Sequence, residues 1–405
     1  MVTGARLVSV FCINMVQGLP ASFFAIGLPA LLREAGAGLD MVALAYLVWA
    51  PWALKWLWGP YLDGGPSFFN AVFGRIAHLP FIMAGVFALL ALFPPSASVG
   101  PVLAIGVVCS FVGATLQMVL ARWIMAVEAD DRRRARLNAA QVGGMITGAM
   151  TGGTLIVALS DLLSWTVAIA AIVALIAAAS LPFLLTQREA ASPRIPLEGE
   201  ERRSAAGIAG ALRQFFTRPG VGLLAGLMLM SDVATGVDVL LAAHLVDNGY
   251  SAARATFLLN TLALAITVAA TFVTARYLER FPVHRVLCAL LFMKASIFLL
   301  FGSGLVSSAY ASAALAIAAV VLASVIAIAY WQIYMRFAAP EQAASDIGIM
   351  TSLRTLFLMA GGIGAGQVAG TIGYDGIFWL AAIMAFAASL LAIIQARQAH
   401  GAAAP

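Results

Sequence analysis

The sequence predicts an all-α membrane protein with twelve transmembrane helices, and two observations carry this prediction. Hydrophobic residues make up 62% of the 405 residues and charged residues 10%, against about 45–50% and 25% in an ordinary soluble domain. Apolar runs near the ~20-residue length of a bilayer crossing recur along the whole chain. We count twelve of them, at residues 7–32, 40–61, 75–93, 100–127, 138–160, 165–186, 219–245, 253–275, 285–304, 311–337, 346–371 and 377–396.

The basic residues of the short loops predict the orientation in the membrane. Cytoplasmic loops carry an excess of Lys and Arg. With both termini in the cytoplasm, seventeen arginines lie inside and only Arg33 and Arg254 lie outside. The net charge of +5 therefore follows from membrane topology and does not indicate nucleic-acid binding. The basic stretch 128–136 is accordingly expected to be a solvated loop.

The chain divides near its middle at residues 187–218, the longest stretch that is not apolar. Six predicted helices precede it and six follow it. This arrangement favours two structurally similar halves related by an axis along the membrane normal. We therefore expect one six-helix bundle over residues 1–186, a cytoplasmic linker over 187–218 and a second bundle over 219–405.

Glycines occur at matching places in the two halves. The run 138–160 holds Gly144, Gly148 and Gly152 at four-residue spacing. The run 346–371 is similarly rich, with Gly361, Gly362, Gly364, Gly366 and Gly370. Small residues let helix backbones approach closely in a membrane. Plain packing would explain either set alone, but their correspondence favours the moving interfaces of an alternating-access transporter.

Four cationic side chains lie inside apolar runs, namely Lys55, Arg122, Lys294 and Arg354. Such charges are costly in a bilayer and usually mark a substrate or ion pathway. Only two carboxylates, Asp232 and Asp238, lie comparably deep. This imbalance predicts a substrate that carries negative charge. Each carboxylate either neutralises a buried cation or carries a proton together with the substrate, and the role of Lys294 stays open.

Several segments resemble the major facilitator superfamily of transporters. They are Gln17–Pro20, Pro51–Lys55, Gly59–Asp63, Asn138–Gly144, Asp232 and Asp247–Ser251. More narrowly, they resemble the branch that contains the muropeptide permease AmpG and the siderophore permeases RhtX and FptX. The resemblance implies a major facilitator fold with two pseudo-symmetric six-helix bundles. It also implies a conformational motif after the second helix, to which Gly59, Asp63 and Arg75 would belong.

The departures from the family pattern concern charge. Where the family has a glutamine followed by two aspartates, this chain retains Gln117 but has Met118 and Arg122 at the aspartate positions. The basic loop that follows the second helix in the family is depleted, since its first arginine is Arg75. A role assigned to those aspartates therefore cannot be transferred to this chain.

The candidate site combines cationic, amide and aromatic side chains. Arg354 is the strongest anion-binding candidate because its guanidinium offers a two-pronged donor to a carboxylate and stays charged. Lys55 and Arg122 lie close enough to helix ends that their charges could instead extend to the membrane surface. The predicted substrate-binding residues are Gln17, Trp52, Lys55, Gln117, Arg122, Gln141, Tyr330, Tyr334 and Arg354. The predicted proton-coupling residues are Asp232 and Asp238.

Motifs of enzymes and of metal sites are absent from the sequence. It has no phosphate-binding loop of the G-x-x-x-x-G-K-[ST] type, so transport is expected to draw on a gradient and not on ATP. The three cysteines and four histidines lie far apart and predict neither a disulfide nor a metal centre. We therefore expect no enzymatic activity and no cofactor.

Two classes of function remain after these exclusions. The first is a secondary transporter, monomeric and in the bacterial inner membrane, that imports an anionic organic solute by proton symport. The resemblance implies a ferric siderophore of the pyochelin or rhizobactin kind, with muropeptide uptake and drug or metabolite efflux as alternatives. The second class is a membrane sensor that transports nothing. It is disfavoured because the twelve helices leave almost no residues for a soluble domain.

Overall fold

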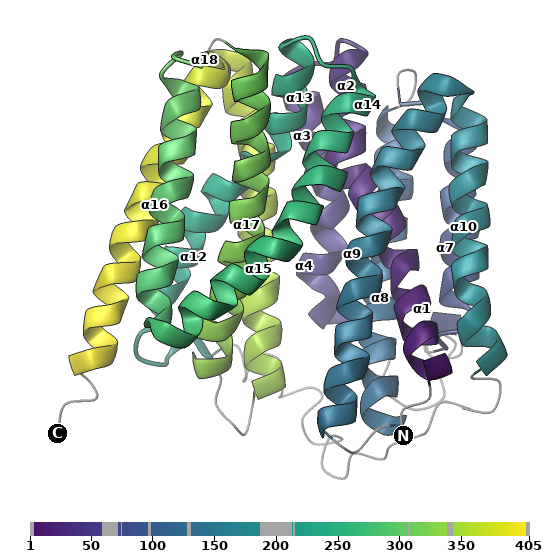
Figure 1. Cartoon of the computed structure of the whole chain (residues 1–405), viewed down its shortest axis with the longest axis horizontal. Helices are drawn as coiled ribbons and strands as arrows, with labels where there is room; N and C mark the ends of the chain where they lie inside the picture. Colours follow the sequence, from purple (N-terminus) through teal and green to yellow (C-terminus); the bar gives the residue numbers. More distant parts are fainter. Residues whose placement is uncertain are drawn as a thin grey trace. The chain divides into compact units, whose positions relative to one another are not determined.

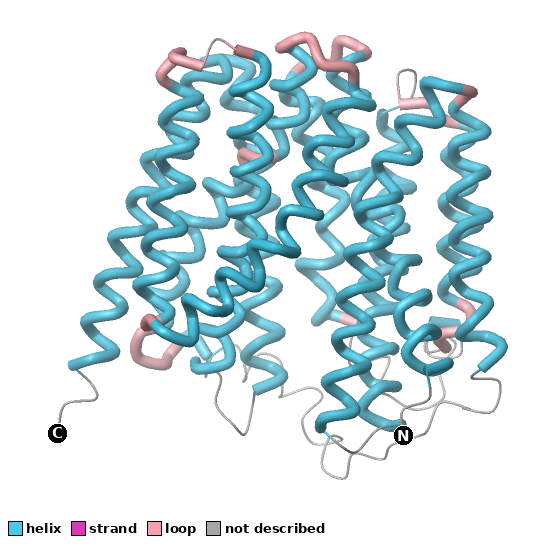
Figure 2. The backbone as a smooth tube through the Cα atoms, viewed as in Figure 1, coloured by secondary structure: helices cyan, strands magenta, loops and turns pink. Residues whose placement is uncertain are grey.

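The computed structural model describes residues 4–58, 72–73, 75–95, 99–127, 131–186, 213, 215–306, 308–337 and 343–401. The predicted positions Gly59 and Asp63 lie outside these ranges, as does most of the predicted linker. The described residues form helices joined by short loops and contain no strand (Figure 2). The predicted all-α class is confirmed.

The helices fall on the predicted apolar runs. Within the described residues, nine are long and apolar enough to cross a membrane. The last of these, Asp346–Arg397, covers two predicted runs. It consists of two helices that meet at Gly373, whose positive φ of 74° interrupts the helical backbone. Two further predicted runs fall on shorter helical pieces, at 39–57 and 79–92. The described residues thus account for all twelve predicted segments.

Contacts divide the chain into two compact units, which are described separately. The first comprises residues 1–35, 47–199 and 252–261, and the second comprises 36–46, 200–251 and 262–405. Two of the predicted segments, 40–61 and 253–275, therefore contribute residues to both units. In both cases the change of unit falls within irregular helix, a 3-10 helix over Leu44–Trp49 and a π-helix over Phe257–Leu262.

The first unit is built around the N-terminal helix (Figure 1). In chain order its elements are α1 (Gly4–Ser22), the π-helix η1 (Phe23–Gly27), α2 (Leu28–Glu34), the end of the 3-10 helix η2 (Leu44–Trp49), α4 (Ala50–Leu54), η3 (Lys55–Leu57), α7 (Leu79–Ala88), η4 (Leu89–Leu92), α8 (Val99–Val127), α9 (Asp131–Leu162), α10 (Trp165–Thr186), α14 (Ala252–Thr256) and most of η5 (Phe257–Leu262). α1 packs mainly along α9 and α10.

The expected loop over 128–136 is wrong for residues 131–136, because α9 begins at Asp131. The helix continues past its apolar run because residues 131–137 contain neither glycine nor proline, and each added residue extends an existing helix at little cost.

The glycines of α9 set its distance from α1. A Cβ atom built on Gly144 would lie 2.0 Å from the carbonyl oxygen of Phe11, and one on Gly152 would lie 2.0 Å from that of Leu19. Gly148 faces the Met15 carbonyl in the same way, at 2.5 Å. The predicted glycine face thus lies against the backbone of α1, where no larger residue fits.

In the second unit the C-terminal segment has the most extensive contacts with other helices, and its last, yellow part lies at the left edge of Figure 1. The elements of this unit are α3 (Leu39–Ala43), the first half of η2, α12 (Val221–Gly236), α13 (Val239–Asp247), α15 (Ala263–Arg280), α16 (Val283–Gly302), α17 (Ala309–Phe337) and α18 (Ala343–Gly401). α12 and α16 both pack along α18. Gly362 and Gly366 of α18 lie against Tyr46 and Ala43, and Gly361 lies against Val233, whereas Gly364 and Gly370 face open space.

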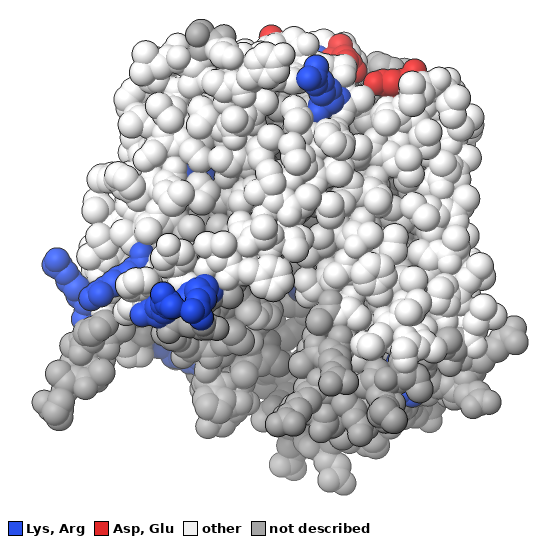
Figure 3. All heavy atoms as spheres, in the orientation of Figure 1, with Lys and Arg blue, Asp and Glu red and all other residues white. Residues whose placement is uncertain are grey.

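Charged residues lie at the helix ends and are scarce along the helices. Figure 3 shows a face that is largely uncharged over the middle of the helices, with Lys and Arg gathered where α15 runs into α16. Arg276, Arg280 and Arg285 are exposed there. This distribution is that of a multi-pass membrane protein whose apolar helix surface faces lipid.

Candidate functional site

Four predicted charges of the second unit form two separate ion pairs, beside a third described pair between Arg218 and Asp346. Asp232, on α12, accepts a hydrogen bond from Arg354 of α18, with 3.1 Å between Nε and Oδ1. Asp238 is paired with Lys294 of α16. The two carboxylates are six positions apart and pair with cations of two different helices, α18 and α16. Each compensates one cation.

Two stacked tyrosines of α17 lie beside the guanidinium of Arg354. The centre of its guanidinium lies 5.7 Å from the centroid of the Tyr330 ring, and the rings of Tyr330 and Tyr334 stack at 5.9 Å. The Tyr330 hydroxyl donates to the carbonyl of Leu227 on α12, at 3.3 Å. Both tyrosines are fully buried. In this structure they support Arg354, and they present no open surface to a ligand.

The Asp232–Arg354 pair has unused hydrogen-bonding capacity. Asp232 is completely buried, while the side chain of Arg354 retains 22% of its exposure. Oδ2 of Asp232 and the hydroxyl of Tyr334 have no hydrogen-bond partner among the described residues. Arg354 uses Nε for Asp232, which leaves its two terminal nitrogens as donors for a further group. A partly exposed arginine beside a buried carboxylate can bind an anion and can respond to a proton.

Three predicted binding residues of the first unit come together. Lys55 begins η3 and donates from Nζ to the Oε1 atom of Gln117 on α8, at 3.1 Å. The same Nζ lies 5.5 Å from the centroid of the Trp52 ring. Among the described residues, Lys55 forms no ion pair with a carboxylate. Its charge is supported only by an amide oxygen and an aromatic face.

Among the described residues, Gln17, Gln141 and Arg75 form no hydrogen bond or ring contact with the cluster of Lys55, Trp52 and Gln117. Gln17 is buried in α1, and its amide nitrogen donates to Asn14 at 3.5 Å. Gln141 is half-buried in α9, and Arg75 is exposed. Arg122 lies within α8, but its side chain is outside the described part of the chain.

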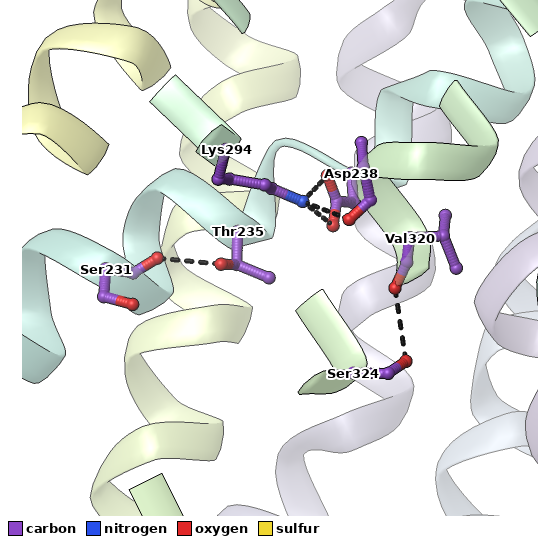
Figure 4. Close-up of polar contacts among 7 residues, drawn as sticks. Ser231, Thr235, Asp238, Lys294, Val320 and Ser324 are labelled. Carbon is purple, nitrogen blue, oxygen red and sulfur yellow. Dashed lines mark hydrogen bonds and ion pairs between the residues drawn. The ribbon is translucent and has the colours of Figure 1, made fainter. Parts of the chain in front are cut away.

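Sequence reasoning missed two polar arrangements. It assigned no role to Lys294, although a lysine and an aspartate at similar depth in neighbouring helices were a signal for the pair in Figure 4. It also missed a link between η5 and α9. Asn260 donates to the Ala149 carbonyl at 2.5 Å, and Thr261 donates to that of Met150 at 2.8 Å. An asparagine within an apolar run was the available signal.

The family is decided by a match to the model of the Major Facilitator Superfamily over residues 10–362. The chain belongs to this superfamily. It is accordingly a secondary transporter for a small molecule and not an enzyme. The resemblance read from the sequence is confirmed for the superfamily, while its narrower AmpG and siderophore-permease branch stays a prediction.

Solved structures of transporters share the fold of this chain. A POT family transporter in complex with a thioalcohol-conjugated peptide superposes with a TM-score of 0.74 at 12% identity, covering 97% of this chain and 96% of the other. A bacterial homologue of the human lysosomal transporter Spinster gives 0.72 at 13% identity, covering 98% of both chains. The nucleoside transporter NupG gives 0.71 at 14% identity, covering 96% and 99%.

One similar sequence is an uncharacterized protein of Haemophilus influenzae. It is 23% identical over 396 residues, which cover 91% of this chain and 89% of the relative.

Proposed function

We propose that this transporter imports an organic anion by proton symport. It acts as a monomer in the bacterial inner membrane, with both termini in the cytoplasm. The proposal rests on the ion pairing and the exposure of two cationic side chains. Lys55 has no carboxylate partner among the described residues, and Arg354 is held by Asp232 through Nε alone while part of its side chain is exposed. Each of these residues, taken by itself, can bind a carboxylate of an anionic solute.

Proton coupling follows from the competition for Arg354. While Asp232 is ionised, its charge lies 3.1 Å from the guanidinium and compensates the charge that an anion would meet. Oδ2 of Asp232 is buried without a hydrogen-bond partner among the described residues and is the atom on which a proton would reside. A proton there weakens the ion pair and leaves Arg354 free for the anion. Anion and proton binding thereby favour each other by linkage.

Within the class of organic anions, we propose a ferric siderophore of the pyochelin or rhizobactin kind. The sequence resemblance to the siderophore permeases supports this choice, and it is also the support for import over efflux. A muropeptide is the alternative, because the same resemblance includes AmpG and its carboxylates would use the same cations. Growth of a deletion strain on individual ferric siderophores as sole iron source separates the two.

The decisive experiment compares Arg354→Gln with Arg285→Gln in vesicles supplied with the anion that supports growth. Arg285 is an exposed arginine in the first turn of α16, so its replacement controls for the loss of one positive charge. Losing charge-assisted hydrogen bonds of about 1.5–3 kcal/mol should lower uptake by Arg354→Gln about 10- to 100-fold at equal membrane abundance. Arg285→Gln should transport like the wild type.

Three outcomes would contradict the proposal. The first is wild-type uptake by Arg354→Gln, and the second is a native substrate that proves to be a cation. The third concerns coupling only. A protonophore should collapse uptake into energised vesicles, so unchanged uptake, or uptake that needs only ATP, would remove proton symport and leave the anion site standing.

A further inference from the structure

The ion pair of Lys294 and Asp238 differs from that of Arg354 and Asp232 in how many of its donors and acceptors are hydrogen-bonded. Nζ of Lys294 lies 2.7 Å from Oδ1 and 2.7 Å from Oδ2 of Asp238 (Figure 4). It also lies 2.8 Å from the carbonyl oxygen of Ala319. An ammonium group has three donors, and here all three have acceptors. Both carboxylate oxygens of Asp238 are likewise bonded, whereas Oδ2 of Asp232 accepts no hydrogen bond from the described part of the chain.

The pair lies at an interruption of a helix. α12 ends at Gly236 and α13 begins at Val239, so Asp238 stands between them. The backbone there is tightened to three-residue hydrogen bonds, from Val237 to Ala234 at 3.3 Å and from Asp238 to Thr235 at 3.0 Å. Lys294 therefore ties this interruption to α16, and through the Ala319 carbonyl to α17.

Burial makes the pair costly to separate. The side chain of Lys294 is 1% exposed and that of Asp238 is 12% exposed. Nζ also lies 4.9 Å from the centroid of the Phe298 ring on the same helix, a favourable position for a cation. Breaking a buried ion pair by removing one partner leaves an uncompensated charge, whereas removing both partners is often nearly neutral.

We infer that Lys294 is a positioning residue that holds Asp238 and the junction of α12 and α13 in place, and that Asp238 exchanges no proton during transport. The predicted proton-coupling pair is thereby divided. Asp232 carries the proton, and Asp238 is a fixed ionic contact. Besides Lys294, the ionisable group that interacts electrostatically with Asp238 is the Tyr46 phenol on η2, which adds no second cation. The role of Asp232 rests on the proposed function, but the role of Lys294 does not.

The test needs no transported substrate, because its probe is the proton. The full-length protein in lipid nanodiscs is titrated with acid while infrared difference spectroscopy follows the C=O stretch of protonated carboxylic acids. The wild type should show a titrating buried carboxyl band that Asp232→Asn removes and Asp238→Asn leaves in place. Lys294→Met should add a second band, since Asp238 then lacks its cation, and Asp238→Asn in that background should remove it.

Hydrogen exchange of residues 237–247 provides an independent measurement. In Lys294→Met these amides should exchange about tenfold faster than in the wild type, since the junction has lost its contact to α16. The double variant Asp238→Asn/Lys294→Gln, which keeps both side chains polar and hydrogen-bonded, should recover most of the protection. It also provides a folded alternative if Lys294→Met does not accumulate in the membrane.

The outcomes separate the two proposals. Removal of the wild-type carboxyl band by Asp238→Asn would overturn the inference, because Asp238 would then exchange a proton. Unchanged exchange of residues 237–247 in Lys294→Met, without a new band, would also overturn it. Failure of Asp232→Asn to remove the wild-type band would instead contradict the proposed proton coupling, while the exchange data would still decide the role of Lys294.

Discussion

Replacing Gly144 by alanine should destabilise the first unit, because α1 passes too close to α9 to admit a methyl group. The new Cβ would lie 2.0 Å from the Phe11 carbonyl oxygen and 2.8 Å from its carbon. An ordinary carbon–oxygen contact is about 3.3 Å, so the two helices would have to separate by more than about 1 Å. The obstacle is backbone, which cannot rotate aside as a side chain can.

The magnitude follows from two opposing effects. Forcing a methyl group into a packed interface costs about 1–3 kcal/mol, and alanine recovers up to about 1 kcal/mol relative to glycine within a helix. A net loss of about 1–2 kcal/mol lowers the melting temperature of a unit of this size by about 2–8 °C. Gly143→Ala is the matched control, since its Cβ would meet only the edge of the Phe11 ring, at 3.4 Å.

The assay is thermal unfolding of the purified protein in detergent, with both variants measured beside the wild type. Gly143→Ala should melt at or slightly above the wild-type temperature, and Gly144→Ala several degrees below it. If Gly144→Ala melted with or above Gly143→Ala, the close approach of α1 and α9 would be refuted, and with it the packing role given to this glycine face.

Three further outcomes test the transport mechanism and the topology. Asp232→Asn should abolish uphill accumulation while exchange of solute across the membrane continues, and accumulation at the wild-type level would remove Asp232 from the coupling. Lys55→Met should raise the KM about tenfold through loss of a charge-assisted contact, whereas Trp58→Phe, which loses a 3.1 Å hydrogen bond to Thr115 but no charge, should leave the KM near the wild-type value. Equal KM values for these two variants would count against Lys55 as an anion-binding residue. Single cysteines placed in 187–218 should react only with reagents that reach the cytoplasm, so labelling from outside would overturn the predicted topology.

The partners of the buried charges could not be read from the sequence. The sequence identified Asp232, Asp238, Lys294 and Arg354 as charges within apolar runs. Together with Lys55 and Arg122, the cations within such runs outnumber the carboxylates, and this excess suggested an anionic substrate. Which carboxylate meets which cation depends on the angular position of each side chain and on how far two helices are shifted along each other. Those quantities are set by packing, and they pair Arg354 with Asp232 and Lys294 with Asp238.

The environment of the aromatic residues was also decided by packing. Tyr330 and Tyr334 were predicted to be substrate-binding residues, as groups that could hydrogen-bond to a ligand and stack on it. In the structure both are buried behind Arg354. Spacing fixes the face of a helix on which two side chains lie, but it does not say whether that face meets a ligand or another helix.

By itself, the sequence determined the class of the fold and the number of its helices. The length of an apolar run and the charge of a loop act locally. Each membrane-spanning segment must hydrogen-bond its own backbone groups and must be apolar over the thickness of the bilayer. The tertiary structure alone decided which polar atoms are satisfied and which stay available. Lys294 and Asp238 satisfy each other, while Asp232 and Arg354 retain capacity for a proton and an anion. Hydrogen bonds are directional and short, so this division arises only when helices distant in sequence are brought within ångströms of each other.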